Sequence, residues 1–418
     1  MARRGSPYRR TLTVGRRPDS CEDRPVAGPD KKNLRFLIAT YLPTTLATIG
    51  IGGIIPLIPL TARQLGGSLE MAAFITALMG IGQLVGDLPA GVIAAKIGEK
   101  RAMLGAAVLD AGALLTAWQA QNLFMLGAAV FAVGLATAVI ALARLSYLTV
   151  AVPPNWRSRA LSTLGGMFRI GFFIGPLIAA GIVAAWGMTP AYLFAAVMSV
   201  VAGLVTLLLP DLPNEQTLAT DNPQRTGLWS VLHAHRRLLA TLGVGALGLM
   251  LVRSARQAIL PLWSDHLGFD PAVSTLIFGI SMGVDMTLFY FGGALMDRFG
   301  RLSVVLPSMV VMGVGLLILP LATTPLTVGL VGALLGLGNG ISSGVVMTLG
   351  SDAAPTTGRT QFLAGWRLMA DSGNAAGPLV ISAVTVAFPL FVASLVVGAL
   401  SFVAGAWLRH FTPRRHSG

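Results

Sequence analysis

The chain has 418 residues, of which 54% are hydrophobic and 11% are charged, and its formal net charge is +13. A soluble protein of this length does not carry so much apolar surface, so the composition excludes a soluble globular enzyme and indicates a polytopic membrane protein. Its apolar runs last about 20 residues, which fits membrane helices and excludes the alternating strands of an outer-membrane barrel.

The order of apolar and polar segments along the chain predicts two groups of membrane helices. Residues 1–33 are basic and polar without an apolar core, so we expect a disordered cytoplasmic tail rather than a cleaved signal peptide. Six apolar segments at 34–209 are separated from six more at 238–408 by a polar connector at 210–237, and a tail at 409–418 follows. The segments begin near Leu34, Leu69, Ala102, Asn122, Leu161, Thr189, Leu238, Pro271, Leu302, Pro325, Thr360 and Phe388.

Lysine and arginine gather in the turns on one side of these segments. On the other side, Arg63 is the only basic residue in the turns apart from histidine. The positive-inside rule then predicts a multi-pass protein of the inner or plasma membrane with both termini and the connector in the cytoplasm. The positive net charge is therefore explained by the orientation of the chain in the membrane, and we expect no nucleic-acid partner. The single cysteine, Cys21, excludes a disulfide framework.

One turn occurs twice. GVIAAKIGEKR begins at Gly91, and GALMDRFGR begins at Gly293, an offset of 293 − 91 = 202 residues. The same offset aligns the GPL triplets at 175–177 and 377–379. The sequence thus predicts an all-α polytopic membrane protein with twelve transmembrane helices in two pseudo-symmetric six-helix bundles, which is typical of transporters.

These features resemble the major facilitator superfamily from Leu34 to Leu408, in particular its twelve-span bacterial proton-coupled exporters of drugs and other small molecules. The second turn fits the family's G-x-L-x-D-R-x-G-R pattern, whereas the first has Ala95 in place of the acid and Glu99 where a base is usual. The resemblance implies that the acid latches the cytoplasmic side shut against a helix N-terminus, so that only Asp297 keeps this role. The implied gate residues are Gly91, Lys96, Gly98, Arg101, Gly293, Asp297, Arg298, Gly300 and Arg301.

A G-x-x-x-G-P motif lies in the fifth and eleventh segments. Its glycines allow a partner helix to pack closely, and its proline removes a hydrogen bond and predicts a kink. In relatives, the longer form G-x-x-x-G-P-x-x-G-G at this place is mostly found in proton-coupled exporters, and this chain has Ala179 and Ala180 where that form has its last two glycines. The motif residues are Gly171, Gly175, Pro176, Gly373, Gly377 and Pro378.

Charged residues inside the segments are the candidates for coupling transport to protons. In the first half, two acids and two bases fall roughly 9–14 Å from the cytoplasmic helix ends at 1.5 Å per residue, so we expect a neutral network there. It comprises Asp87, Asp110, Arg144 and Arg169.

In the second half, Arg367 and Asp371 are four residues apart and are expected to pair along one helix face. Arg253 and Arg256 lie nearer the outside. Asp285 is then left with a shared Arg367, or with Arg253 reached from above, and an acid short of a partner can exchange protons. Asp285 is therefore the first candidate for the coupling proton and Asp371 the second, with Asp87 and Asp110 in reserve.

Polar and aromatic side chains in the segments are candidates to line a substrate cavity. No catalytic or metal-binding constellation stands out, so we expect neither an enzyme nor a cofactor, with the proton gradient as energy source. The cavity candidates are Tyr41, Thr45, Thr48, Tyr290 and Trp366.

The leading interpretation is a monomeric proton antiporter for the efflux of small apolar or amphipathic organic molecules. Its partners would be the substrate, protons and the lipid bilayer. Two alternatives remain open on the sequence. One is an importer or symporter of a small organic solute, and the other is a membrane sensor or scaffold that keeps the fold without transporting.

Overall fold

The computed structural model describes residues 31–152, 156–209, 228–355 and 358–412, and their regular elements are all helical. Nearly all of the predicted tail and most of the connector lie outside these ranges. The first half of the chain forms α1 (Lys31–Ile54), α2 (Leu57–Gln64), α3 (Leu69–Ile97), α4 (Glu99–Trp118), α5 (Leu123–Ala151), α6 (Arg157–Trp186) and α7 (Thr189–Thr206). The second half forms α8 (Leu228–Ala234), α9 (Arg236–Leu238), η3 (Leu239–Gly243), α10 (Val244–His266), α11 (Pro271–Phe299), α12 (Leu302–Ile318), η4 (Leu319–Leu321), α13 (Pro325–Ile341), α14 (Val345–Ala353), α15 (Arg359–Thr385) and α16 (Leu390–Phe411).

These helices begin within about two turns of the predicted starts. Within the described residues, eleven helical stretches are long and apolar enough to cross a membrane. The remaining predicted span is α15, which is 27 residues long but carries Arg367 and Asp371. Its polar residues are explained by its neighbours, because α15 packs against α3 and α10 rather than facing lipid all round.

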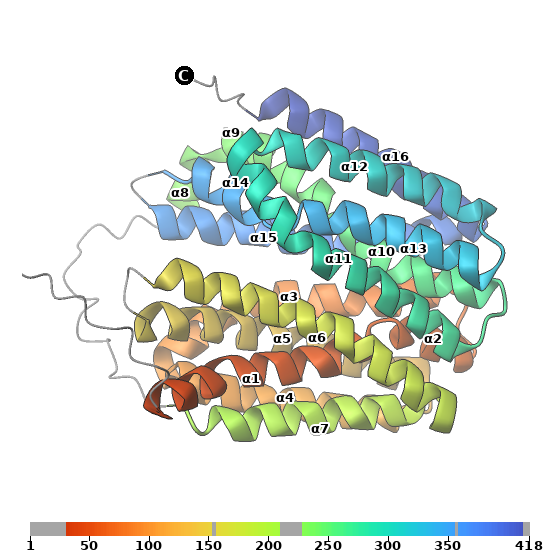
Figure 1. The fold of residues 1–418 in the computed structure, drawn as a ribbon, viewed down its shortest axis with the longest axis horizontal. Helices are drawn as coiled ribbons and strands as arrows, with labels where there is room; N and C mark the ends of the chain where they lie inside the picture. Colours follow the sequence, from red (N-terminus) through yellow and green to blue (C-terminus); the bar gives the residue numbers. More distant parts are fainter. Residues whose placement is uncertain (1–30, 153–155, 210–227, 356–357, 413–418) are drawn as a thin grey trace, which may run out of the picture.

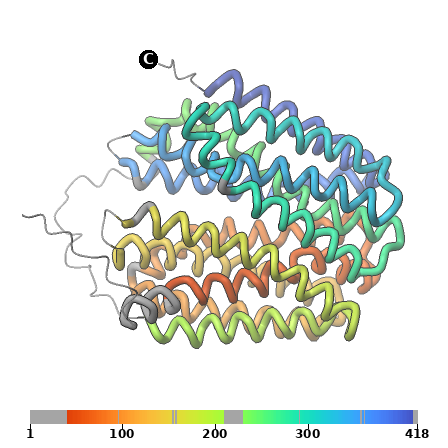
Figure 2. Tube along the Cα trace, in the orientation of Figure 1, coloured from red at the N-terminus to blue at the C-terminus, as the bar shows by residue number. Residues whose placement is uncertain are grey.

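The helices of the two halves form two bundles, called here the N half (α1–α7) and the C half (α8–α16). Figure 1 shows them as two layers that meet along α3 and α15 and along α6 and α11, two pairs of helices in extensive contact. The start of α1, the end of α16 and α8 lie together at one end of the molecule, the connector end. The layers come closest at the opposite, far end, where α2 lies (Figure 2).

The backbone repeats the 202-residue offset of the sequence. Gly66 and Gly98 have φ of +84° and +85°, and their equivalents Gly268 and Gly300 have φ of +74° and +87°. Each of these glycines follows a membrane helix at a tight turn, where a side chain is disfavoured by the left-handed backbone. The repeat predicted from the sequence is thereby confirmed as a structural one.

The G-x-x-x-G-P motifs are sites of close helix packing, as predicted. A Cβ added to Gly175 would lie 2.3 Å from the carbonyl oxygen of Ile49 on α1. A Cβ on Gly373 would lie 2.3 Å from that of Leu247 on α10. Both α6 and α15 continue as helix through their motif prolines.

Two spans are broken in ways that the hydropathy pattern did not predict. The first span is interrupted at residues 55–56, between α1 and α2, and the tenth at 342–344, between α13 and α14. Non-helical backbone at membrane depth is tolerated where protein groups satisfy its hydrogen bonds or where it lines a cavity. The break at 342–344 meets both conditions.

Candidate functional site

A cavity of about 530 Å³ lies between the two halves. One wall is α6, and the other walls come from α10, α11, α13, α14 and the break before α14. The cavity extends from the middle of α11 to Leu161, in the second turn of α6 from the connector end. Its polar and charged lining comprises Ser162, Arg169, Gln257, Asp285, Asn339, Ser343 and Thr348, and its large apolar lining comprises Leu161, Phe168, Phe172, Met282, Phe289 and Met347.

Asp285 is the buried acid of this cavity, with a relative exposure of 5%. Its carboxylate forms an ion pair with Arg169 of the N half and a second one, at 3.5 Å, with Arg256 of the C half. The side-chain amide of Asn339 also donates to it. The prediction that Asp285 lacks a partner is therefore wrong. Counting bases within one half missed Arg169, which reaches Asp285 across the α6–α11 contact.

Arg253 has a different partner. Its guanidinium donates to the backbone oxygen of Ser342 at 2.6 Å and to the hydroxyl of Ser342 at 2.7 Å. Ser342 is the first residue of the break between α13 and α14, so the arginine satisfies a carbonyl that the interrupted helix leaves free. Arg253 thus stabilises the break and does not take the predicted place beside Asp285.

A second cluster of charges lies at the α3–α15 contact. Arg367 forms an ion pair with Asp371 at 3.4 Å, which confirms the predicted pair along the helix. The same guanidinium contacts Asp87 of the N half at 3.0 Å, and Asn374 donates to Asp371 at 3.2 Å. Two carboxylates, one from each half, therefore share one guanidinium. We call Asp87, Arg367 and Asp371 the triad.

The neutral network predicted within the N half does not exist. Asp87 and Arg169 each pair with a residue of the C half instead, Asp87 with Arg367 and Arg169 with Asp285. Arg144 is buried and donates to the hydroxyl of Thr44 on α1. Asp110 is 1% exposed on α4, a helix that packs against α5 and α7, and forms no ion pair with any residue that the structure describes. Similar depth did not bring these side chains together, because the helices present them to different neighbours.

The predicted cavity residues are mostly used for helix packing. Thr48 is buried and donates to the backbone of α1, and the indole of Trp366 donates to the carbonyl oxygen of Val346 at 3.0 Å. Tyr41 donates to the carbonyl oxygen of Ala160 at 3.3 Å, and Thr45 donates to the carbonyl oxygen of Tyr41. These four do not line the cavity, and the side chain of Tyr290 lies outside the described set.

Phe168 and Phe172 in the aromatic lining are residues that the sequence analysis did not select. Phe168 and Phe172 lie one turn apart on α6, on either side of Arg169. The ring of Phe289 lies under the Arg169 guanidinium at 4.5 Å from its centroid. The available signal was a charged residue, Arg169, with phenylalanine at i−1 and i+3 in a membrane helix. Charged side chains in such helices face the bundle interior or a water-filled cavity, so the neighbouring rings were candidates to line that cavity.

The far end of the interface is closed by two features. Arg63 at the end of α2 forms an ion pair of 3.0 Å with Asp265 at the end of α10. The two residues are 202 positions apart, so they occupy equivalent places in the two halves. Below them, Ile51, Ile55, Phe278 and Met282 form an apolar cluster between α1 and α11. The structure is thus closed at the far end.

We expect the Arg63–Asp265 pair to bias the molecule toward this closed state by a small amount. The two side chains are 36% and 29% exposed, so the pair is worth about 0–1 kcal/mol. Arg63→Asp should raise thiol labelling of a cysteine at Ile55, in a background lacking Cys21, by a few-fold, about the factor that ~1 kcal/mol allows. The exchange Arg63→Asp with Asp265→Arg should restore the original labelling, since the positions are equivalent. Labelling that stays high in the exchanged protein would contradict this role.

Comparison with known proteins identifies the family. The pattern described as "Major Facilitator Superfamily" matches residues 41–378 and 242–418, which together cover most of the chain. The chain belongs to the major facilitator superfamily. The superfamily is one of membrane transporters, so the protein is a secondary transporter and not an enzyme.

Curated relatives within the superfamily share part of the chain. It is 25% identical over 170 residues to "Multidrug resistance protein MdtG" of Erwinia billingiae, and 29% identical over 186 residues to the protein of that name from Salmonella schwarzengrund. The matches cover 40% and 42% of this chain, and 41% and 43% of those relatives. The matched region therefore spans about two fifths of their length.

Solved structures of the superfamily share the whole fold. The nucleoside transporter NupG superimposes with a TM-score of 0.71 and 17% identity over 91% of this chain and 100% of that one. A D-xylose–proton symporter superimposes with a TM-score of 0.68 and 16% identity over 90% of this chain and 98% of that one. At such identity these structures establish the fold alone.

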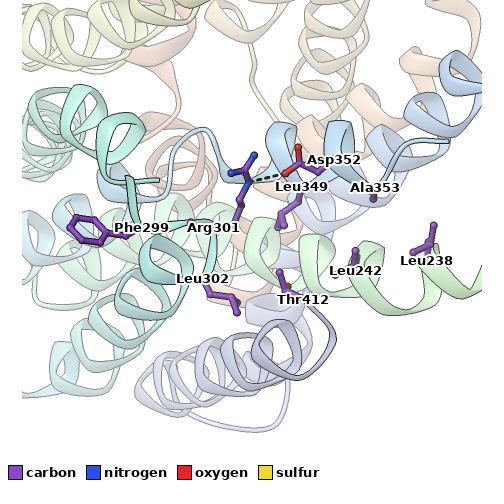
Figure 3. A pocket seen from close by; sticks show the side chains of 10 residues that line it. Leu238, Leu242, Phe299, Arg301, Leu302, Leu349, Asp352, Ala353 and Thr412 are labelled. Carbon is purple, nitrogen blue, oxygen red and sulfur yellow. Dashed lines mark hydrogen bonds and ion pairs between the residues drawn. The ribbon is translucent and has the colours of Figure 1, made fainter. Parts of the chain in front are cut away.

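The repeated turn of the superfamily motif is tethered within each half. Ser146 on α5 donates to Glu99 at 2.9 Å in the first copy. In the second copy, Arg301 donates to Asp352 on α14 at 2.7 Å (Figure 3). Positions 99 and 301 are equivalent under the 202-residue offset. Arg301 thereby anchors the α11–α12 turn to its own half, beside a pocket of about 600 Å³ between that turn, α14 and η3.

The predicted latch is not engaged in this conformation. Asp297 is exposed and forms no ion pair with a described residue, and the side chain of Ala95 lies outside the description. Lys96, Arg101 and Arg298 are exposed as well. A free Asp297 fits a state that is closed at the far end, and its role as a latch stays a prediction.

Proposed function

We propose that this superfamily member couples the export of small amphipathic organic molecules to protons by alternating access. The observation that carries the proposal is the triad, because it joins ionisable groups of both halves at a contact that alternating access must rearrange. Asp87 comes from α3, whereas Arg367 and Asp371 come from α15. The curated relatives named as multidrug resistance proteins support the direction of export.

The chemistry of the triad suits a proton. With both acids ionised, two carboxylates and one guanidinium carry a net charge of −1 in a poorly solvated contact. One bound proton brings the triad to neutrality, and it also changes which carboxylate holds Arg367. Loss or gain of that proton therefore alters the attraction between α3 and α15. In this proposal the triad replaces Asp285 as the coupling group, because Asp285 already pairs with two arginines.

The orientation follows from the charge distribution. The arginine-rich turns lie at the connector end, so we place that end in the cytoplasm, and the cavity then faces inward. A reporter protein that works only in the cytoplasm is expected to be active when it is fused after Gly418 or inserted between residues 213 and 225. Alkaline phosphatase activity at either place would contradict the twelve-span topology.

Inverted membrane vesicles test the transport itself. With an acid interior imposed, we expect an amphipathic dye to accumulate inside vesicles that contain the protein, and an uncoupler to abolish the accumulation. Accumulation driven instead in right-side-out vesicles would support an importer. Binding of the dye with no flux under any gradient, including exchange, would support a sensor. Vesicles prepared without the protein are the control.

A further inference from the structure

The charges around the cavity do not balance. Arg169 and Arg256 pair with a single acid, Asp285, and Arg253, one helix turn before Arg256, forms no ion pair with any acid that the structure describes. Three guanidinium groups and one carboxylate give this side of the interface a net charge of +2. Burial of uncompensated charge is costly, so such a cluster favours an anionic partner.

We propose that the cavity binds an organic anion with an aromatic or apolar body, and that the anionic group replaces Asp285 on Arg169. This inference rests on the proposed function and names the substrate class for the same site. A volume of about 530 Å³ lies within the range of about 300–1,000 Å³ that suits small organic ligands.

Arg169 is the arginine that a ligand reaches. Its side chain is 21% exposed and lines the cavity, whereas Arg256 is 1% exposed and is covered by Ser281, Met282 and Asp285. Arg253 is held by Ser342 at the helix break. A carboxylate on the ligand therefore meets the guanidinium of Arg169 first.

The exchange leaves no group unsatisfied. When the ligand takes Arg169, Asp285 keeps its ion pair with Arg256 and its hydrogen bond from Asn339. The apolar body of the ligand then lies against Phe168, Phe172 and Phe289, where it is removed from water. Because Arg169 belongs to the N half and Asp285 to the C half, the exchange also releases an ion pair between the halves.

A cation has no comparable site here. Asp285 is the acid that lines the cavity, and its carboxylate already accepts from Arg169, Arg256 and Asn339. A positive ligand would have to displace these donors and add a charge to a cluster that is already positive. The aromatic rings alone do not offset that repulsion.

The test uses three ligands with the same aromatic body. Purified protein is titrated with naphthalene-1-acetate, with its neutral amide and with 2-(1-naphthyl)ethylammonium, with no gradient present. We expect the carboxylate to bind at least about tenfold more tightly than the amide, as charge-assisted pairs with arginine allow. The ammonium compound should bind most weakly. Equal binding of carboxylate and amide, or tighter binding of the ammonium compound, would overturn the proposal.

Two variants sharpen the test. Arg169→Gln should reduce carboxylate binding to the level of the amide, and Asp285→Asn should tighten carboxylate binding because the internal competitor for Arg169 is gone. For a cationic ligand, Asp285→Asn would weaken binding instead. Gel filtration tests whether each variant folds, and the ligand series on the unaltered protein remains a valid test if either variant unfolds.

Selective anion binding without proton-driven flux would refute the proposed coupling and leave the binding inference intact. Proton-driven flux by a protein that prefers the amide or the ammonium compound would support the proposed coupling and refute the binding inference.

Discussion

Asp371→Asn is expected to abolish proton-driven transport while leaving a folded protein that still binds substrate. Asparagine keeps the shape of the side chain and removes its charge, so the triad becomes neutral without a proton. Arg367 keeps Asp87 as a partner at 3.0 Å, so its half-buried guanidinium is not left without a carboxylate. We expect proton release on substrate binding, followed with a pH-indicator dye, to fall at least about tenfold, and substrate exchange without a gradient to persist.

The same reasoning predicts a matched set of variants. Asp87→Asn should behave like Asp371→Asn, since Arg367 then keeps Asp371. The double variant leaves Arg367 without a carboxylate and should unfold more readily, by less than the about 3–5 kcal/mol that a fully buried pair loses with one partner, because the Arg367 side chain is 30% exposed. Asp110→Asn is the control, because this buried acid lies on α4, away from the contacts between the halves. Proton release that is unchanged in both single variants would contradict the assignment.

Gly134→Ala is expected to prevent stable assembly of the N half. A Cβ on Gly134 would lie 2.1 Å from the carbonyl oxygen of Met79, where α5 crosses α3. Neither backbone can yield without separating the helices, and overpacking of this kind costs about 1–3 kcal/mol or more. The equivalent change Gly336→Ala should have a similar effect in the C half, because its Cβ would lie 2.2 Å from the carbonyl oxygen of Ser281.

Thermal unfolding in detergent, followed by size-exclusion of a fluorescent fusion, measures this effect. Gly112→Ala on α4 is the matched control, since a Cβ there meets no atom within 4 Å and alanine is the better helix former. We expect Gly112→Ala to match or slightly exceed the stability of the unaltered protein. If Gly134→Ala unfolds at the same temperature as Gly112→Ala, close packing at this crossing is not needed for the fold.

The sequence analysis was reliable where the physics is local. Helix positions followed from runs of apolar residues, because each span must satisfy its own backbone hydrogen bonds in lipid. Gly98 and Gly300 marked the repeated turn, and the offset of 202 residues appeared both in the sequence and in the backbone angles of the turn glycines. The Arg367–Asp371 pair was predictable for the same reason, since residues four apart share a helix face.

The two helix breaks show where local signals weaken. Residues 338–344 read GNGISSG, a glycine- and serine-rich stretch inside an apolar run. Such a stretch is compatible with an intact helix, and the break becomes stable because Arg253, far away in sequence on α10, binds Ser342. Hydropathy contains no information about that arginine's position.

By itself the sequence determined the membrane class, the twelve spans, the repeat and the superfamily turn, because all of these depend on composition and spacing along one segment. Only the tertiary structure decided which charges meet. Asp285 with Arg169, Asp87 with Arg367 and Arg63 with Asp265 join residues 116, 280 and 202 positions apart, and each pair crosses between the halves. Depth along a helix axis gives the level of a charge, but its partner depends on which helices touch and on the rotation of each helix about its axis. Those are set by the packing of the two bundles against each other.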